Sequence, residues 1–116
     1  MKHGRLMIEP EQCVLPDVKK TTHFLERLCG LLLRKKLQAN EALYITPCSS
    51  VHTLGMRYSI DLIYVDKECR IVKMVKTLRP CCFSICHSAQ GVIELNANKL
   101  QTLNLEIGQR LIWKDI

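Results

Sequence analysis

Short apolar runs that are rich in β-branched and aromatic residues recur along most of the chain. Such runs predict strands, and they lie at residues 5–9, 43–45, 58–65, 71–78, 92–95 and 110–113. The segment Asp-Lys-Glu-Cys-Arg at residues 66–70 separates the third run from the fourth and is typical of a hairpin connection. We therefore expect two adjacent antiparallel strands in the middle of the chain.

Two segments show helical spacing instead. The first predicts one amphipathic helix that ends near residues 30–33, with Thr21 or Thr22 as its N-cap; its inward positions are Phe24, Leu25, Leu28, Cys29 and Leu32. The second predicts a short helix over residues 97–103, capped by Asn96, before Gly108 marks the turn into the last strand.

Strands with two separated helices, and without a regular alternation of strand and helix, predict an α+β fold. We expect a β-rich, mostly antiparallel sheet that is curled or barrel-like, with one amphipathic helix and a second short helix. The 116 residues are 47% apolar and 24% charged and contain no repeat or linker, so we expect a single domain over residues 1–116.

Cysteine usage and the absence of an apolar leader indicate the compartment. Seven cysteines are an odd number, and their spacing is not that of a disulfide framework. The N-terminus lacks the apolar core of a signal peptide, and Arg34-Lys35-Lys36 interrupts the longest apolar stretch. We expect a cytoplasmic protein with reduced thiols and no membrane partner.

Three stretches of the chain resemble a known family. The set resembles the uncharacterised prokaryotic family called domain of unknown function 192, over about residues 22–111. The stretches are Gly30-Leu31-Leu32-Leu33-Arg34, the run from Pro47 to Asp66 that contains Ser-Val-His-Thr-Leu-Gly-Met-Arg and then Ile-Asp-Leu, and Val92-Ile93-Glu94-Leu95 with Gly108. The resemblance implies a small β-rich domain with a packed helix, and it brings no agreed activity, cofactor or substrate.

The sequence departs from the common pattern of that family at two positions. Cys69 stands in the hairpin where a glycine often occurs, and Asn98 stands where a glycine is frequent before the short helix. The cysteine-rich segment at residues 81–87 is also distinctive, so the resemblance implies no role for its thiols.

Asp61 is the most informative polar residue of the chain. Alternation along the predicted strand places its side chain on the same face as Ile63 and Val65. A carboxylate on an apolar face is costly unless it is paired or hydrogen-bonded. We expect His52 or Arg57 to supply that partner across a turn.

Two readings of this polar cluster stay open. In one, it lines a ligand pocket with Met56 and Tyr58 as apolar walls, and the binding residues are Ser50, His52, Thr53, Met56, Arg57 and Asp61. In the other, the same side chains form a structural network that orients a turn and satisfies backbone groups.

A hydrolase and a metal site are weaker hypotheses. Cys48 or Ser50 is a conceivable nucleophile with His52 and Asp61, but no strained nucleophile turn or glycine-rich oxyanion loop accompanies them. Thiolate and imidazole suit zinc, yet the spacing of the thiol and imidazole groups closes a tetrahedron poorly; the residues concerned are Cys48, Cys81, Cys82, Cys86 and His87. We expect no cofactor.

The formal net charge of +6 suits an acidic partner such as nucleic acid. Basic residues cluster only at Lys19-Lys20 and Arg34-Lys35-Lys36, and the 5% of aromatic residues leave few rings for stacking bases. The leading hypothesis is a non-catalytic binding or accessory module that recognises a small ligand or a protein segment at the Ser50 to Asp61 motif. A nucleic-acid-associated protein is the alternative, and an enzyme centred on His52 and Asp61 comes third.

Overall fold

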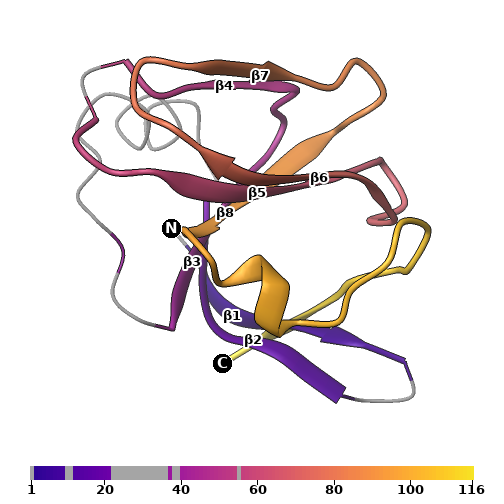
Figure 1. Cartoon of the computed structure of the whole chain (residues 1–116). Helices are drawn as coiled ribbons and strands as arrows, with labels where there is room; N and C mark the ends of the chain where they lie inside the picture. The colour runs from indigo at the N-terminus through magenta and orange to yellow at the C-terminus, as the bar shows by residue number, and fades with distance from the viewer. Residues whose placement is uncertain (1, 10–11, 22–36, 38–39, 55) are drawn as a thin grey trace.

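The computed structural model describes residues 2–9, 12–21, 37, 40–54 and 56–116 (Figure 1). The regular structure of these residues consists of nine strands and one 3-10 turn. The elements are β1 (Lys2–Ile8), β2 (Gln12–Lys20), β3 (Glu41–Ile45), β4 (Ser50–His52), β5 (Ile60–Val65), β6 (Ile71–Leu78), β7 (Phe83–Ile85), β8 (Gly91–Asn96), η1 (Leu100–Thr102) and β9 (Ile112–Asp115).

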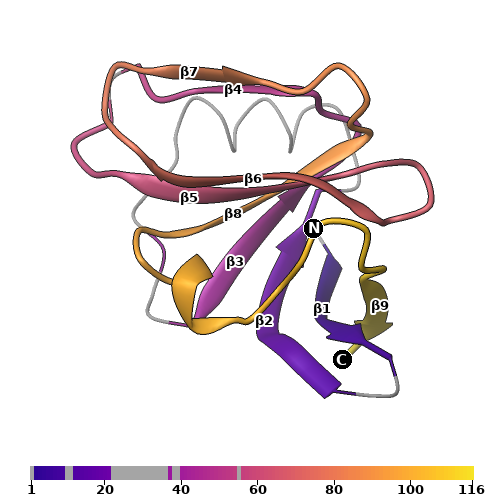
Figure 2. The ribbon, with the colours of Figure 1, turned by 45° about the vertical axis from the view of Figure 1, so that its right-hand side comes forward.

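Seven of these strands form one sheet in the order β6-β5-β8-β3-β2-β1-β9. All neighbours in it are antiparallel except β2 and β3, which are parallel. The remaining two strands, β4 and β7, pair with each other in a separate two-stranded sheet. Figures 1 and 2 show this pair as a layer over β5 and β6, at the opposite end of the molecule from β1, β2 and β9.

β5 lies between β6 and β8 in the main sheet, and all six of its side chains are buried. Ile63 and Val65 pack in one apolar cluster, whereas Leu62 and Tyr64 pack in the other. Successive side chains of a strand point to opposite faces. Both faces of the sheet are therefore covered at β5, and the predicted placement of Asp61 on the face of Ile63 and Val65 is confirmed.

The predicted α+β class is wrong. The part of the chain that the structure describes is almost entirely β, and the amphipathic helix expected to end near residues 30–33 lies outside that part. The helix expected over residues 97–103 is only the 3-10 turn at Leu100–Thr102. Asn98 and Asn104 flank this turn with φ values of 72° and 50°, which are left-handed conformations that interrupt a helix.

The predicted cap is also wrong, because Asn96 does not cap the short turn. Its side-chain amide donates to the carbonyl oxygen of Leu37 instead. No side chain caps the turn at Lys99, its first flanking residue. The backbone N–H of Leu100 donates to the carboxylate of Asp61, which belongs to a different strand.

The predicted strands are confirmed as β1, β3, β5, β6, β8 and β9, with ends that differ by a few residues. The strand β2 was not predicted, because its Pro16 is typical of a break between elements. Gly4 pairs with Val18 and Leu6 pairs with Leu15, so β2 carries one extra residue at Pro16. A bulge tolerates proline, which has no N–H to give to the ladder.

Backbone conformation accounts for the glycine that is common in the family at the two positions where this chain has another residue. Cys69 has a φ of 64° and Asn98 a φ of 72°. Glycine adopts this region without strain, whereas a side chain raises its energy by about 1 kcal/mol, least for asparagine.

No helix in the described ranges is long and apolar enough to cross a membrane.

We predict that Asn98→Gly raises the free energy of unfolding by about 0.5 kcal/mol and that Asn98→Val lowers it by at least about 1 kcal/mol. Asn98 is exposed and has a positive φ, so the backbone conformation dominates both effects. Urea denaturation measures these changes. Lys99→Gly is the matched control, since Lys99 has a φ of −68° and glycine there lowers stability. Equal effects of glycine at the two positions would contradict the prediction.

Candidate functional site

The six residues of the predicted site come from separate elements of the fold. Asp61 lies in the main sheet, while Ser50 and His52 lie on β4 of the strand pair that covers it. Thr53 and Asp61 are fully buried, at 0% and 1% exposure. Their hydrogen bonds show what each of them does.

Both carboxylate oxygens of Asp61 accept hydrogen bonds from backbone N–H groups. Oδ1 accepts from Thr77 at 2.8 Å and Oδ2 accepts from Leu100 at 2.9 Å. Thr77 has a φ of 57° where the register of β5 and β6 shifts, so the carboxylate holds an irregular point of β6 and the 3-10 turn together. The prediction that His52 or Arg57 pairs with Asp61 is wrong, and Asp61 acts as a structural residue.

Thr53 fixes the loop that follows β6. Its hydroxyl donates to the carbonyl oxygen of Arg79 at 2.6 Å and accepts from the N–H of Cys82 at 2.8 Å. Its own N–H donates to the carbonyl oxygen of Cys82, and its carbonyl oxygen accepts from the N–H of Cys81. Through these bonds Thr53 holds β4 to the loop before β7.

Met56 and Arg57 have separate surroundings. Met56 packs against the core cluster that contains Leu62 and Tyr64. Arg57 is exposed and makes no ion pair with any residue that the structure describes. Of the predicted set, Ser50 and His52 remain as neighbours on one surface.

That surface is the outer face of the β4–β7 pair, formed by Ser50, His52, Phe83 and Ile85. Ser50 lies opposite Ile85 and His52 lies opposite Phe83 in the register of the two strands. Opposed residues of an antiparallel pair point to the same side. Phe83 is 64% exposed and Ile85 is 38% exposed, which is unusual for apolar residues of a strand.

Polar contacts tie the inner face of the same pair to the main sheet. The Tyr64 hydroxyl donates to Oγ of Ser84 at 3.0 Å, and the Lys73 ammonium donates to the carbonyl oxygen of Ile85 at 2.9 Å. Val51, between Ser50 and His52, is 1% exposed and packs in the core. The outer face is therefore presented on a fixed support.

Burial raises the pKa of the Tyr64 hydroxyl above its ordinary value of 10.0. The hydrogen bond with Ser84 opposes this shift, and the nearby groups Cys48, Cys86 and Glu94 add to it by charge repulsion. Tyr64 therefore keeps its proton under neutral conditions and serves as a hydrogen-bond donor beneath β7.

The residues proposed for hydrolysis are not arranged as a triad. Cys48 Sγ donates to the carbonyl oxygen of Ser50 at 3.0 Å. Nδ1 of His52 is buried and makes no hydrogen bond, and both oxygens of Asp61 already accept backbone N–H groups. A nucleophile needs a base within hydrogen-bond reach and an orienting carboxylate behind it. These side chains do not form that chain of contacts.

The metal hypothesis finds no shared site in the ranges described. Within them, no three His, Cys, Asp or Glu side chains are grouped so as to hold a metal ion. Cys81 and Cys82 are exposed, while Cys48 and Cys86 are half-buried. The structure therefore does not bring these thiols together with His87 as a ligand set.

The basic cluster at Lys19-Lys20 is engaged within the protein. The Lys19 ammonium lies 3.4 Å from the Glu41 carboxylate. The Lys20 ammonium lies 5.3 Å from the ring centroids of both Tyr44 and Trp113. Arg34-Lys35-Lys36 lies outside the described residues. Of the two predicted basic clusters, the one that the structure describes therefore has contacts within the protein.

Comparison with known proteins agrees with this all-β arrangement and with the sequence motifs. The model of the family called domain of unknown function 192, described as uncharacterized ACR, matches residues 7–113. The chain belongs to this family.

Curated relatives in archaea carry the family designation UPF0127. A Pyrococcus furiosus protein is 28% identical over 103 residues, which are 84% of this chain and 86% of that protein. A Thermococcus sibiricus protein is 33% identical over 104 residues, which are 84% of this chain and 66% of that protein. Neither is named for an activity, so they extend the family without supplying a function.

Solved structures share the fold. A candidate transcription regulator from Sinorhizobium meliloti superimposes with a TM-score of 0.77 at 16% identity, over 97% of this chain and 92% of that one. A protein of unknown function from Novosphingobium aromaticivorans gives a TM-score of 0.71 at 16% identity, over 96% and 84%. At this level of identity the likeness shows the fold alone.

We predict that Asp61→Asn lowers the free energy of unfolding by at least about 2 kcal/mol, because an amide offers one acceptor and leaves a buried N–H facing its NH₂ group. Urea denaturation measures the loss. Asp66→Asn is the matched control and should change stability by less than about 0.5 kcal/mol. Asp66 accepts the N–H groups of Glu68 and Arg70 with one oxygen, Oδ1, which an amide retains. Equal losses in the two variants would contradict the assigned role of Asp61.

The raised pKa of Tyr64 predicts a pH dependence of stability. In the unfolded chain this tyrosine loses its proton near pH 10.0, whereas the folded protein holds it to higher pH. The unfolded state is therefore favoured as pH rises past that value, and the free energy of unfolding falls. In Tyr64→Phe this fall should be shallower. Urea midpoints measured between about pH 8 and about pH 11 test it, and parallel curves for the two proteins would contradict it.

Proposed function

We propose that the protein is a non-catalytic recognition module that binds an acidic, apolar protein segment on the outer face of the β4–β7 pair. This proposal keeps Ser50 and His52 from the predicted site and adds Phe83 and Ile85. The single observation that carries it is the exposure of apolar side chains on a strand pair whose surroundings are basic.

The apolar part of the surface lies along one line of the strand pair. Phe83 and Ile85 alternate with buried Ser84, so two apolar side chains point outward where a polar residue is usual. Leu54 is 66% exposed and follows Thr53, whose backbone pairs with Cys82 at the end of the same strands. Scattered exposed apolar residues are ordinary, but a group on one face is typical of a contact surface.

The charge around this surface has one sign. Residues 46–60 and 71–93 contain no aspartate or glutamate, and they contain the basic residues Arg57, Lys73, Lys76 and Arg79. Asp61 and Glu94, which directly follow these segments, are buried, whereas Glu68, three residues before the second segment, is exposed. A partner with carboxylates beside its apolar side chains complements this surface and is drawn to it over a distance.

The support under the outer face favours binding without rearrangement. Tyr64 holds Ser84, Lys73 holds the Ile85 carbonyl, and Thr53 holds the loop that leads into β7. A surface that is already fixed loses little conformational entropy when a partner binds. This arrangement supports recognition of a segment that orders itself on the protein.

Single-stranded nucleic acid is the competing partner, and the name of the Sinorhizobium meliloti protein, a candidate transcription regulator, is consistent with it. Bases stack on aromatic rings, and stacking platforms use several of them. The outer face has one exposed ring, Phe83, while Leu54 and Ile85 are aliphatic. The composition of the surface therefore favours a protein segment.

The test uses a fluorescein-labelled peptide of alternating glutamate and leucine, and a second peptide of alternating lysine and leucine. We predict by fluorescence anisotropy that the protein binds the acidic peptide at least about tenfold more tightly than the basic one. The double variant Phe83→Ser/Ile85→Thr should weaken acidic-peptide binding by at least about tenfold. Ile107→Ser is the matched control, because Ile107 is 58% exposed but lies outside the outer face, and it should leave binding unchanged.

Three results would overturn the proposal. They are equal affinity for the two peptides, full binding by the double variant, and equal losses in the double variant and Ile107→Ser. Tighter binding of an oligothymidine than of the acidic peptide, lost in Phe83→Ser/Ile85→Thr, would assign the outer face to nucleic acid instead. Circular dichroism of each variant shows whether the fold is retained.

A further inference from the structure

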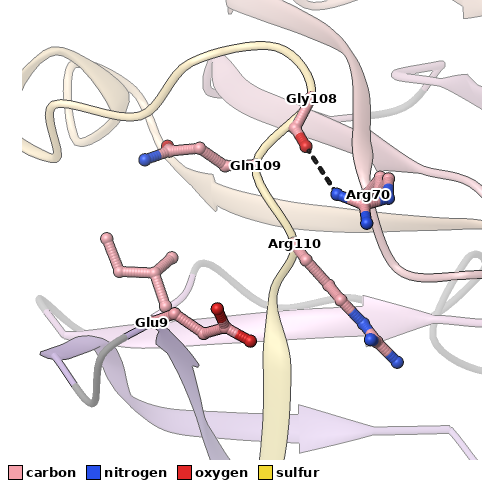
Figure 3. A pocket seen from close by; sticks show the side chains of 6 residues that line it. Glu9, Arg70, Gly108, Gln109 and Arg110 are labelled. Carbon is pink, nitrogen blue, oxygen red and sulfur yellow. Dashed lines mark hydrogen bonds between the residues drawn. The ribbon is translucent and has the colours of Figure 1, made fainter.

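A hollow of about 200 Å³ lies between the end of β1, at Ile8 and Glu9, and the paired segments that contain Arg70 and residues 108–110. It shares no residue with the outer face of β4–β7. Figure 3 shows Arg70, Gly108, Gln109 and Arg110 on one side of it and Glu9 on the other; its lining residues are Ile8, Glu9, Arg70, Gly108, Gln109 and Arg110.

Two arginines face each other at this hollow. Arg70 and Arg110 form an isolated antiparallel bridge, which makes them directly opposed cross-strand neighbours. Opposed residues of such a bridge lie about 5 Å apart at Cβ, and like charges in this position are unfavourable. The chain nevertheless places two permanent positive charges there, which is the arrangement that binds an anion between them.

The backbone around the two arginines is fixed. The backbone N–H of Ile71 donates to the carbonyl oxygen of Gln109 at 2.8 Å, and the backbone N–H of Leu111 donates to the carbonyl oxygen of Cys69 at 2.9 Å. The Arg70 guanidinium also donates to the carbonyl oxygen of Gly108 at 3.2 Å, a bond drawn in Figure 3. The backbone positions of the two arginines are therefore set by the fold, and the Arg70 guanidinium is held at one point.

The carboxylates near the arginines leave the charge largely uncompensated. Glu68 lies 4.0 Å from Nε of Arg70, and their side chains are 63% and 50% exposed, so this ion pair is weak. Arg110 forms no ion pair with a residue in the described ranges. Glu9 faces the hollow from the β1 side without such a pair (Figure 3).

The side chain of Gln109 makes a hydrogen bond within its own turn. Its Oε1 accepts the N–H of Glu106 at 2.8 Å, which assigns the amide orientation and leaves the Nε2 group as a donor. Figure 3 shows the side chains of Gln109 and Arg110 leaving the backbone on opposite sides. The two guanidinium groups are therefore the donors that one anion is able to share.

We infer that this hollow binds a small oxyanion, the shared chemistry of a phosphate group and a carboxylate group. Arg70 and Arg110 supply both the charge and the hydrogen-bond donors. Glu9 on the opposite side repels the anion and limits its charge and size. Removal of a basic residue and removal of the acidic one should therefore change affinity in opposite directions.

The experiment is an amide NMR titration of the full chain with inorganic phosphate and, separately, with acetate, at constant ionic strength set with chloride. Both series follow the amides of Arg70, Gly108, Gln109 and Arg110. We expect shifts confined to this group, an affinity at least about fivefold weaker in Arg110→Gln, and about two- to fivefold tighter in Glu9→Gln. Arg110→Lys should fall between the wild type and Arg110→Gln, because it keeps the charge and loses the planar fork.

Lys67→Gln is the matched control. Lys67 is exposed in the β5–β6 connection and does not line the hollow. The Lys67→Gln variant loses one positive charge, as Arg110→Gln does, but its affinity for the anion should stay within about twofold of the wild type. Stronger binding of phosphate assigns the site to phosphate groups, and stronger binding of acetate assigns it to carboxylates. The inference fails if neither anion shifts these amides, if Lys67→Gln weakens binding as much as Arg110→Gln, or if Glu9→Gln does not tighten it.

Discussion

The two hydrogen bonds that the Asp61 carboxylate accepts hold the irregular parts of the main sheet in place. The carboxylate is buried in β5, where an unsatisfied charge would strongly destabilise the fold. Its two oxygens accept from Thr77 in β6 and from Leu100 in the turn after β8. One side chain therefore links β5 to the irregular point of β6 and to the turn that follows β8.

The central part of the fold follows from local sequence, and the rest does not. Alternation around Asp61 predicts its burial and the strand that carries it, and both are confirmed. Its partners are backbone groups 16 and 39 residues away, which no side-chain pattern marks. The strand through Pro16 was missed because a bulge, visible only from the pairing with β1, makes room for the proline. The α+β class failed at residues 97–103, where Asn98 and Asn104 leave space for a single turn.

The candidate surface was half-predictable for a similar reason. Ser50 and His52 are two residues apart, so a strand places them on the same side, and this is what the structure has. Their neighbours Phe83 and Ile85 come from a strand of three residues, which is too short to give a periodic signal. The apolar and polar positions of that strand are also inverted relative to an ordinary half-buried strand, because Ser84 faces Tyr64 inside the protein. Only the pairing of β4 with β7 brings the four residues together.

The pairing of β9 with β1 joins the two ends of the chain, with Leu6 opposite Trp113 and Gly4 opposite Asp115. During synthesis the β1–β2 hairpin therefore emerges from the ribosome long before β9, the strand that pairs with the other side of β1. Until residues 112–115 follow, one side of β1 presents unpaired backbone groups that another strand is able to join. Closure of this side of the sheet is consequently a long-range event in folding, and β1 depends on residues 112–115 for its protection.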